Sequence, residues 1–553
     1  MSEIIYNLRL FFDFSPTELG VTAFFLILIL GFRGTKLRTW TVLTGIFLLL
    51  MEVDLAVWYV FGGLVAFNIA PLRRILVSNL VFYVIGKLNF VPKISETERI
   101  ALEAGTVWVE GEFFSGKPDF KRVFSEDYPS LSVEEQAFLD GPAETLCSMV
   151  DDWEVHQNRG FSDEVWAYMK DNGFFGMIIP KKYGGLEFSA VAHGAIIAKL
   201  SARCSPLGIT VMVPNSLGPG ELINHYGTDA QRDYYLPRLA KGQDIPCFGL
   251  TEPDAGSDAG AMTSRGDLFK GDDGKLYIRL NWKKRYITLS GLSSIIGLAF
   301  KLYDPEKLLG KSDSFGITCA LVPSDAAGVV LGRYHDPLGI PFCNCPTEGH
   351  DVVISADAII GGVERAGSGW KMLMESLATG RGISLPATCA GGSKLVTKVV
   401  SAYTAVRKQF GVSIGQFEGI ESPLSRISGM TYIIESASRF TCGAIDRGVK
   451  PSVVSAIIKY HTTEMLRTVI NDGMDVLGGK AISRGPKNLL AHPYFGIPVG
   501  ITVEGANILT RTLIIFGQGA IRCHPFALKQ VNAIESGDKK AFDLAFWGHA
   551  GHV

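Results

Sequence analysis

Residues 247–258, Cys-Phe-Gly-Leu-Thr-Glu-Pro-Asp-Ala-Gly-Ser-Asp, concentrate small hydroxyl and turn-forming side chains in one short segment. Thr251 and Ser257 supply hydroxyl groups, and Gly256 leaves the backbone free to turn. Such a loop can present hydroxyl and backbone N–H donors to an anionic or polar ligand. Loops of this composition are more often simple turns, so the segment indicates a ligand site only together with other residues.

A second chemical candidate is Glu504, which follows the apolar run Gly500-Ile-Thr-Val503 and precedes Gly505. Desolvation raises the pKa of a carboxyl group in such surroundings and makes its carboxylate a stronger base. A base of that kind suits the removal of a weakly acidic proton on the carbon next to a carbonyl group. Taken alone, a lone glutamate is more often a solvated charge at a helix end.

Arg407 carries a planar guanidinium whose fork of donors matches a diphosphate. The same residue fits an arginine that complements the dipole at the C-terminus of a helix. The sequence predicts no metal site, because its ten histidines are scattered and its nine cysteines include no C-x-x-C pair. Free thiols in a reducing compartment are the expected state. Neither a Rossmann nor a P-loop glycine motif occurs.

The segment from residue 131 to residue 242 has helical patterning. Within them, Phe161–Asn172 has amphipathic spacing and stops at Gly173, a typical helix terminator. Ala190–Ala202 is rich in Ala and Ile, which is typical of a buried helix. A connector rich in Gly, Pro and charges precedes these helices and predicts an ordered, loop-rich segment.

The patterning then changes twice. Period-two alternation at Leu276–Trp282, Phe315–Leu321 and Asp351–Ile354 predicts a β domain, and long helical windows return at Ser393–Lys408 and Ser452–Leu477. The order helix, sheet, helix predicts an α+β fold in which the sheet or barrel lies in the middle. The expected divisions are a membrane-anchor segment at 1–92, a connector and N-terminal helical domain at 93–246, a β domain at 247–365, a C-terminal helical bundle at 366–530 and a tail at 531–553.

The first ninety residues hold most of the apolar excess of a chain that is 47% hydrophobic. Uncharged runs at Leu19–Phe32, Trp40–Met51 and Leu55–Ala70 are each shorter than the roughly 20 residues that a spanning helix needs. The start, Met-Ser-Glu, lacks the basic region of a signal peptide. Basic clusters at Arg33–Arg38 and Arg73–Arg74 suit anionic headgroups and place the following domain in the cytoplasm. We expect a membrane anchor with an open number of crossings; the alternative is a buried helical hairpin.

Net charge is −2, which gives no footprint for nucleic acid. The same balance gives no footprint for an acidic partner.

Five motifs together resemble the acyl-CoA dehydrogenase family over roughly residues 130–525. The segment 251–258 resembles the family signature at the junction between its N-terminal helical domain and its middle β domain. Further matches follow in the family's order: Lys284-Arg-Tyr-Ile-Thr288, Arg407-Lys-Gln-Phe-Gly411, Leu477-Gly-Gly479 and Val503-Glu-Gly505. The apolar N-terminus and the segment Val213–Glu221 also resemble the bacterial, membrane-associated, long-chain branch of fatty-acid β-oxidation.

The resemblance implies FAD as cofactor and a fatty acyl-CoA as substrate. The family's motifs imply which residues would contact the FAD and which would contact the acyl-CoA. FAD would be bound by Phe248, Leu250, Thr251, Ser257, Tyr286 and Thr288, and by Arg407, Gln409, Phe410 and Gly479 reaching the FAD of a neighbouring subunit in a homodimer. The acyl-CoA would be bound by Ser257, Arg381, Val503 and Gly505.

The implied reaction converts a medium- or long-chain acyl-CoA to trans-2-enoyl-CoA, the first step of β-oxidation. Glu504 would remove the α-proton while the β-hydrogen leaves as hydride to flavin N5. Some branches place the base on an earlier helix, but the matching position here is Gly380. An electron-transfer flavoprotein or similar protein would accept the electrons, at the bacterial inner membrane with the catalytic domain in the cytoplasm.

The sequence departs from the family pattern at several positions. Tyr286 stands where most relatives have Trp, Asp475 where a Gln is common and Ala506 where a Thr is common. Ala378 replaces the acid that usually accompanies the arginine at 381. Longer members of the branch continue past the last residue, so we expect a C-terminal region to be missing.

Two alternatives stay open. An acyl-CoA oxidase of the same fold would use O₂ to reoxidise the flavin. A non-catalytic acyl-CoA- or lipid-binding relative is disfavoured by the joint presence of Thr251, Thr288 and Glu504.

Overall fold

The computed structural model describes residues 16–33, 35–50, 53–88, 94–116, 118–310 and 312–550. The chain forms two compact units, a terminal unit of residues 1–94 and 520–553 and a catalytic unit of residues 95–519. The terminal unit thus takes residues from both ends of the chain. All nine cysteines are free thiols.

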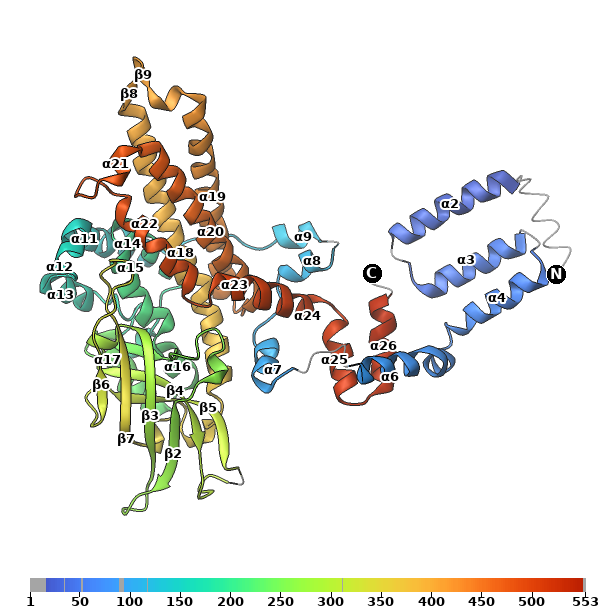
Figure 1. Cartoon of the computed structure of the whole chain (residues 1–553), viewed down its shortest axis with the longest axis horizontal. Coiled ribbons are helices and arrows are strands. Elements are labelled where there is room, and N and C mark those ends of the chain that lie inside the picture. Colours follow the sequence, from blue (N-terminus) through green and yellow to red (C-terminus); the bar gives the residue numbers. More distant parts are fainter. Residues whose placement is uncertain are drawn as a thin grey trace. The chain divides into compact units, whose positions relative to one another are not determined.

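The terminal unit is helical in its described parts (Figure 1). Its elements are α2 (Pro16–Phe32), α3 (Leu37–Leu50), α4 (Leu55–Ala66), α5 (Ala70–Arg73), the π-helical turn η1 (Arg74–Ser78), α6 (Asn79–Lys87), α25 (Ala527–Glu535) and α26 (Lys539–Ala550). Among the described helices, none taken singly is long and apolar enough to cross a membrane; only the bent pair Ala491–Thr502 and Asn507–Cys523 meets that test by length and composition. The predicted transmembrane helix is not confirmed.

A buried carboxylate joins the two ends of the chain inside the terminal unit. The Asp543 side chain is fully buried and accepts hydrogen bonds from Arg73 Nη2 at 2.7 Å and Ser78 Oγ at 2.5 Å. Trp547 Nε1 donates to the same Ser78 hydroxyl at 2.9 Å. Arg73, which the sequence predicted to face lipid headgroups, is thus paired inside the protein. Its partner lies 470 residues away in sequence, so local patterning gave no sign of it.

The catalytic unit begins with a helical domain. Its helices are α7 (Glu96–Glu103), α8 (Glu110–Phe114), α9 (Phe120–Phe124), α10 (Val133–Asp140), α11 (Pro142–Met149), α12 (Asp152–Asn158), α13 (Asp163–Asp171), α14 (Ala190–Arg203), α15 (Ser205–Met212), α16 (Pro219–Tyr226) and α17 (Asp229–Ala240). The helices predicted near 161–172 and 190–202 are confirmed as α13 and α14. Ser132 and Glu135 form a capping box at the start of α10, and Phe174 and Phe175 are fully buried in the core beside these helices.

The middle domain is a seven-stranded sheet. Its strands are β1 (Pro246–Gly249), β2 (Arg265–Lys270), β3 (Leu276–Thr288), β4 (Ile295–Tyr303), β5 (Ser314–Pro323), β6 (Val329–Leu331) and β7 (Asn344–Ser355). The hydrogen-bonded order is β1-β4-β2-β3-β7-β6, and β5 pairs with the other edge of β4. β1 and β2 both run parallel to β4 and lie one after the other along it, while the remaining pairs are antiparallel.

The chain then returns to helices, which confirms the α+β order predicted from the patterning. These elements are α18 (Gly369–Val406), the hairpin β8 (Lys408–Gln409) and β9 (Val412–Ser413), α19 (Glu418–Asp446), α20 (Ser452–Leu477), α21 (Gly479–Ile482), α22 (Ala491–Thr502), α23 (Asn507–Leu509), the π-helical segment η9 (Thr510–Gln518) and α24 (Gly519–Cys523). The long helices α18, α19 and α20 run side by side away from the sheet, and the β8–β9 hairpin caps their far end (Figure 1).

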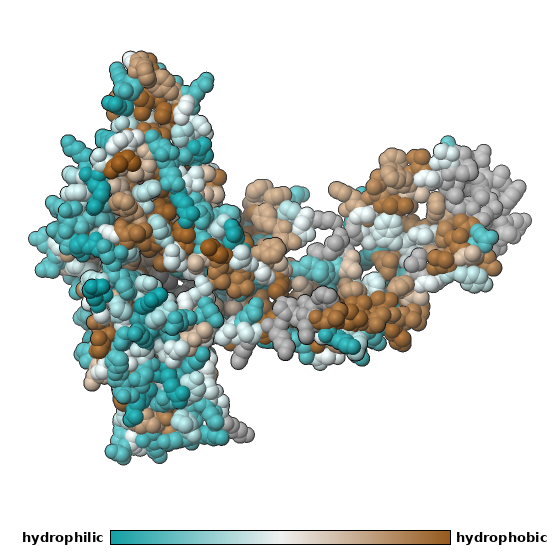
Figure 2. Space-filling view, viewed as in Figure 1, coloured by the Kyte–Doolittle hydropathy of each residue, from teal (hydrophilic) through white to brown (hydrophobic). Residues whose placement is uncertain are grey.

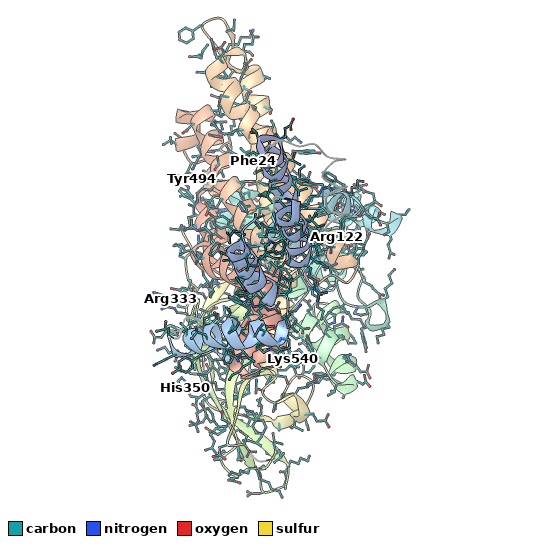
Figure 3. All side chains as sticks on the ribbon, turned by 90° about the vertical axis from the view of Figure 1, so that its right-hand side faces the viewer. Phe24, Arg122, Arg333, His350, Tyr494 and Lys540 are labelled. Atoms are coloured by element: carbon teal, nitrogen blue, oxygen red, sulfur yellow. The ribbon has the colours of Figure 1, made fainter. Side chains whose placement is uncertain are left out.

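Helix α18 connects the sheet to the helical bundle. It begins against β5, where Gly367 N donates to Thr318 Oγ1 at 2.9 Å. It passes Arg381 and ends at the hairpin that carries Arg407. Figure 3 shows α22 at its labelled residue Tyr494 among the bundle helices, and β7 at His350 in the sheet. Helix α18 thus connects Arg381, a predicted substrate contact, to Arg407, a predicted cofactor contact.

Candidate active site

Glu504 lies in a tight turn directly after α22. Its backbone adopts the left-handed conformation with φ 55°, and Gly505 follows with φ 87°. A side chain in this conformation costs on the order of 1 kcal/mol relative to a right-handed one, so the surroundings must hold the turn in place. Both carboxylate oxygens are buried, and neither has a hydrogen-bond partner among the described residues.

Two cations set the electrostatics of this carboxylate. Burial raises the pKa of Glu504 to about 7, and Arg381 and Lys459 pull it in the opposite direction. Arg381 Nε donates a hydrogen bond of 2.9 Å to the backbone carbonyl of Glu504 and leaves the carboxylate unpaired. Burial lowers the pKa of Arg381, while the charge of Glu504 raises it. The arrangement suits a carboxyl group that gains and loses a proton near neutral pH.

Lys459 is a residue of this site that the sequence prediction missed. Its side chain is fully buried in α20 and donates hydrogen bonds to the carbonyls of Ile501 and Gly505 and to Asn507 Oδ1. Burial lowers its pKa to about 8, against the influence of Glu504. A signal was present in the sequence, because Lys459 follows the apolar stretch Val453–Ile458 in a helix, where a charge requires a partner.

The predicted substrate contacts Arg381, Val503 and Gly505 are all found around Glu504. A side chain at Gly505 would come within 3.5 Å of Arg381 Nη2, so these two positions are in close contact. Thr510 Oγ1 donates to the Gly505 carbonyl at 3.1 Å. A hydroxyl four residues after Ala506 thus helps to close the loop, although position 506 lacks the threonine that is common in the family.

The loop after β1 is fixed by a buried ion pair, which the sequence analysis did not predict. Lys284 Nζ lies 2.8 Å from Glu252 Oε1, and both side chains are almost completely buried. Burial opposes ionisation of Glu252, but hydrogen bonds from Lys284, Ser264 and Thr263 outweigh it and lower its pKa to about 2. Lys284 Nζ also donates to the Leu250 carbonyl at 2.9 Å. The pair therefore locks the backbone that carries Phe248, Leu250 and Thr251.

Tyr286 is turned outward by a bulge in β3. Arg285 and Tyr286 together oppose the single residue Pro346 of β7, and Tyr286 has φ 61°. Proline cannot donate to the strand ladder, which makes this a favourable place for an extra residue. The Tyr286 ring is 55% exposed. Arg285 N donates to the Thr251 carbonyl at 3.0 Å, so the bulge and the signature loop are neighbours.

Thr288 and Ser257 complete this second cluster of predicted residues. Thr288 Oγ1 accepts a hydrogen bond of 3.2 Å from Asn344, which also contacts His335 at 2.8 Å. Within the part of the chain that the structure describes, the hydroxyls of Thr251 and Ser257 make no hydrogen bond. Free hydroxyls, an exposed ring and a rigid loop fit a planar, polar cofactor such as a flavin.

The remaining predicted cofactor contacts lie at the far end of the bundle. Arg407, Gln409 and Phe410 are exposed on the β8–β9 hairpin, where Phe410 is 95% exposed. Gly479 is exposed at the start of α21, with no atom within 4 Å of the position of a Cβ. In Figure 1 the hairpin lies at the opposite end of α18 and α19 from the sheet. These residues are not brought to the Thr251 loop of their own chain.

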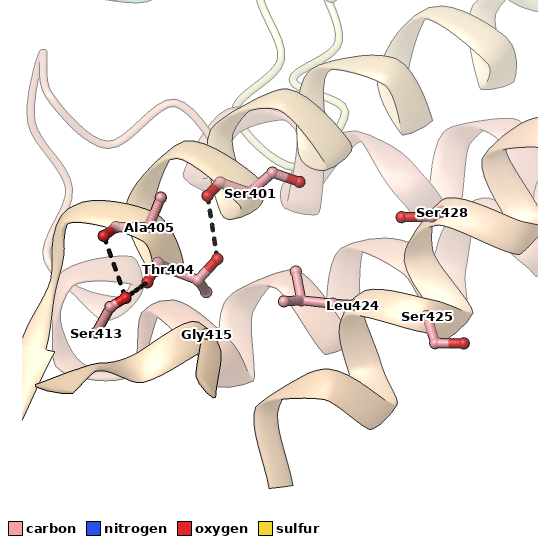
Figure 4. Close-up of a pocket in the computed structure, with 8 residues that line it drawn as sticks. All are labelled: Ser401, Thr404, Ala405, Ser413, Gly415, Leu424, Ser425 and Ser428. Carbon is pink, nitrogen blue, oxygen red and sulfur yellow. Dashed lines mark hydrogen bonds between the residues drawn. The ribbon is translucent and has the colours of Figure 1, made fainter. Parts of the chain in front are cut away.

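A hollow of about 490 Å³ lies at the base of this hairpin (Figure 4). Its walls are small or hydroxyl side chains together with one leucine: Ser401, Thr404, Ala405, Ser413, Gly415, Leu424, Ser425 and Ser428. Ser413 Oγ donates to the carbonyls of Thr404 and Ala405, so part of the polar lining is already satisfied. The lining contains no titratable side chain, so this hollow offers no group for acid–base catalysis.

A third polar cluster joins α12 to α22. His492 Nδ1 lies 2.6 Å from Asp152 Oδ2, and the His156 and His492 rings stack 3.5 Å apart at 11°. The three side chains could approach one metal ion by distance alone. Parallel stacked rings direct their nitrogen lone pairs side by side and not toward a common point, which is unsuited to tetrahedral coordination. We assign no metal to this cluster.

The fold has a helical N-terminal domain, a seven-stranded middle sheet and a helical C-terminal bundle that carries the buried Glu504 carboxylate. Sequence models of the acyl-CoA dehydrogenase N-terminal, middle and C-terminal domains match residues 134–243, 247–352 and 367–516, and the bacterial-type C-terminal model matches 521–553. The chain belongs to the acyl-CoA dehydrogenase family, a family of FAD-dependent oxidoreductases.

Individual relatives agree with this assignment. The chain is 31% identical to a 3-(aryl)acrylate reductase of Clostridium sporogenes over 59% of its own length and 82% of that protein. It is 29% identical to the probable acyl-CoA dehydrogenase FadE10 of Mycobacterium tuberculosis over 73% of its length, and it spans only 62% of that relative. The structure of butyryl-CoA dehydrogenase from Megasphaera elsdenii is similar with a TM-score of 0.63 and 23% identity, covering 70% of this chain and 98% of the other.

Proposed function

We propose that the protein is an FAD-dependent dehydrogenase that converts a medium- or long-chain fatty acyl-CoA to the trans-2-enoyl-CoA. The observation that carries this proposal is the unpartnered, buried carboxylate of Glu504 beside Arg381 and Lys459. A structural carboxylate at that depth would be hydrogen-bonded. An unpaired carboxylate with a pKa near 7 is instead ready to accept a proton.

FAD fits the residues of the sheet cluster. Thr251 and Ser257 offer hydroxyl donors, Tyr286 offers an exposed aromatic face, and the backbone near Phe248 and Leu250 is rigid because of the Glu252–Lys284 pair. When bound, FAD supplies the acceptor for a hydride. Arg407, Gln409, Phe410 and Gly479 face solvent at the hairpin end, which is the disposition expected of residues that bind the cofactor of a second subunit. A homodimer is therefore part of the proposal.

Glu504 performs the proton transfer. Its carboxylate takes the proton from the α-carbon, the electron pair of the β C–H bond leaves with its hydrogen as hydride, and the α,β double bond forms. Burial strengthens the base by raising its pKa. Arg381, bound to the Glu504 backbone carbonyl, directs the turn and contributes positive charge near the developing negative charge on the thioester oxygen. Arg381, Val503, Gly505 and Ser257 are the proposed contacts of the acyl-CoA.

The terminal unit is proposed to associate with a membrane. Helices α2, α3 and α4 expose many large apolar side chains, including Phe24, Phe25 and Phe32, and Figure 2 shows hydrophobic residues on the surface of this unit. Arg33 and Lys36 lie between α2 and α3. Apolar surface next to basic residues suits binding to an anionic bilayer. The bacterial inner membrane, with the catalytic unit in the cytoplasm, is the proposed location.

Flotation with vesicles tests the membrane proposal. The full chain is expected to float with vesicles that contain anionic lipid, and the double substitution Phe24→Glu/Ile27→Glu is expected to reduce flotation strongly. The matched control is Val133→Glu/Tyr432→Glu, which places the same charges on exposed apolar residues of the catalytic unit. Equal flotation of all three proteins would contradict a role for α2.

The first test of the catalytic proposal is an anaerobic visible spectrum of the purified protein before and after addition of a long-chain acyl-CoA. We expect an oxidised-flavin spectrum that bleaches, and a rate of bleaching about 10²–10⁴-fold lower in Glu504→Gln. Rapid reoxidation by O₂ would favour the oxidase, whereas slow reoxidation accelerated by an electron-transfer flavoprotein would favour the dehydrogenase. A protein that cannot be reconstituted with FAD would leave a non-catalytic, acyl-CoA- or lipid-binding relative.

A further inference from the structure

Lys459 is a charged side chain with no exposure to solvent in the helical bundle. It projects from α20 toward the loop that follows α22, where its Nζ lies 2.7 Å from Asn507 Oδ1, 2.8 Å from the Gly505 carbonyl and 3.2 Å from the Ile501 carbonyl. Burying an ammonium group is costly unless every donor is used. Its three partners all belong to the seven residues that contain Glu504.

The hydrogen bonds determine the charge state of this lysine. Asn507 Nδ2 donates to Thr463 Oγ1 at 3.0 Å and to Glu464 Oε1 at 2.8 Å, so the amide must present its oxygen to Lys459. The other two partners are carbonyls and can only accept. A neutral amine has two N–H donors and an ammonium group has three. Three acceptors around one nitrogen therefore favour the charged form and oppose the effect of burial.

The three bonds also explain why Lys459 does not pair with the carboxylate beside it. All its donors are directed at the backbone on either side of Glu504 and at Asn507, which leaves Glu504 Oε1 and Oε2 without a partner in the described part of the chain. A direct ion pair would hold the carboxylate ionised and weaken it as a base. Lys459 instead acts on Glu504 through the backbone and through its electric field.

We propose that Lys459 is the positioning residue of the proton-abstracting carboxylate: its ammonium group fixes the chain on both sides of Glu504 and favours the ionised carboxylate without binding it. This inference rests on the proposed role of Glu504 as the base. It also accounts for the left-handed turn at Glu504. The Nζ of Lys459 binds the carbonyls of Ile501 and Gly505, and Arg381 Nε binds the carbonyl of Glu504, which lies between them in the chain.

The charged groups that influence Glu504 come from two helices, Arg381 from α18 and Lys459 from α20. Cys389 on α18 and Glu464 on α20 are titratable groups that influence Lys459. The cations Arg381 and Lys459 lower the pKa of the carboxyl group, and burial raises it. Cys389 is a buried neutral thiol whose pKa burial raises to about 12, so it stays uncharged through the neutral range. Glu464 is bound to Asn507 and is part of the lysine's environment.

Infrared titration of the full-length protein tests the proposal without any need for flavin or substrate. The carbonyl band of protonated Glu504 is identified by its loss in Glu504→Gln and followed against pH. In Lys459→Met we expect the midpoint to rise by about one pH unit or more, because a buried positive charge next to the carboxyl group is lost. Lys459→Arg should restore most of the shift.

The matched control is Lys284→Met, which removes the other fully buried lysine, from the Glu252 pair. It should leave the Glu504 midpoint unchanged. An unchanged midpoint in folded Lys459→Met, or an equal shift in Lys284→Met, would overturn the proposal.

A milder variant covers the case in which Lys459→Met does not fold. Asn507→Ala deletes one acceptor and retains the lysine, and we expect faster amide hydrogen exchange across residues 501–507 than in the wild type. Unchanged exchange in that loop would also overturn the proposal. These readouts are independent of the bleaching experiment, so a failure of the proposed dehydrogenase activity and a failure of the role of Lys459 give different results.

Discussion

Two buried glutamates of the catalytic unit have opposite surroundings. Glu252, in the loop after β1, accepts hydrogen bonds from Lys284, Ser264 and Thr263, and its pKa falls to about 2. Glu504, after α22, is influenced by the cations Arg381 and Lys459, but its carboxylate has no hydrogen bond to any described residue, and its pKa rises to about 7. Both are close to a fully buried lysine. The difference is where the lysine directs its donors, and this separates a carboxylate that holds the fold from one that can take part in chemistry.

The lysines reinforce the comparison. Lys284 donates directly to its glutamate, so the pair is neutral and rigid. Lys459 donates to the main chain around its glutamate, so the position is fixed while the proton-binding oxygens stay free. A buried carboxylate near a lysine is therefore not by itself evidence of a salt bridge. The first of these pairs supports the proposed FAD cluster, and the second supports the proposed base.

The largest expected effect is on stability. Glu252→Gln leaves the Lys284 ammonium buried without its counter-charge, and we expect the free energy of unfolding to fall by about 3–5 kcal/mol. Urea unfolding at pH 7.5 followed by circular dichroism measures the change. Glu504→Gln is the matched control and should not lower the same quantity, because it removes a buried carboxylate whose pKa is raised in the folded state. Similar losses in both variants would show that the two carboxylates have the same structural role.

The next effect concerns the rate of flavin reduction by acyl-CoA. Glu504 must be ionised to accept the α-proton, so the rate should fall about tenfold for each pH unit below the pKa of about 7 and level off above it. Stopped-flow absorbance between pH 5.5 and 9, with ionic strength held constant, gives the profile. A rate that is independent of pH below 6.5 would contradict proton transfer to Glu504 as the limiting step.

The two glutamates should also give stability opposite dependences on pH. The pKa of Glu504 is about 7 in the folded state against 4.5 when unfolded, so its contribution is present below pH 4.5 and is lost as pH rises toward 7. The pKa of Glu252 is lowered, so its contribution is present above pH 4.5 and is lost as pH falls toward 2. In unfolding curves at several pH values, Glu504→Gln should remove a decline between pH 4.5 and 7.

The smallest effect on stability is expected at the hairpin tip. Phe410 is almost fully exposed, so Phe410→Ala should change the free energy of unfolding of the chain by less than about 0.5 kcal/mol. If the ring binds the cofactor of a second subunit, FAD should dissociate about tenfold more readily. Fluorescence of released flavin measures this, with the exposed Tyr432→Ala on α19 as control. Unchanged release would remove Phe410 from the proposed site.

Much of the architecture could be predicted from local patterning. Period-two alternation and amphipathic spacing depend only on neighbouring residues, and they placed β5, α13, α14 and α20 close to their observed bounds. The strands β3 and β7 were predicted too short, because β3 continues to Thr288 and β7 begins at Asn344. The spanning helix was not confirmed, because apolar content alone does not give a single helix the required length. Arg73 was assigned to a membrane surface because it belongs to a basic cluster beside an apolar run. Its pairing with Asp543 could not be foreseen, since the two residues are distant in sequence.

The sequence by itself determined which residues could do chemistry. Glu504, Arg381, Thr251, Tyr286 and Arg407 were identified from motifs that resemble those of the family, and all five lie within the segments that the middle-domain and C-terminal-domain models match. The type of each side chain and the order of the motifs are properties of the sequence, so they can be read without knowledge of the fold.

Only the tertiary structure decided which of those residues meet and in what charge state. It placed Lys459 around the Glu504 turn, set Lys284 against Glu252 and carried Arg407 to the opposite end of the bundle. Desolvation and hydrogen bonding depend on atoms brought together from distant parts of the chain. For that reason the same residue type is a hydrogen-bonded anion at position 252 and, at position 504, a carboxyl group with a raised pKa and no hydrogen-bond partner among the described residues.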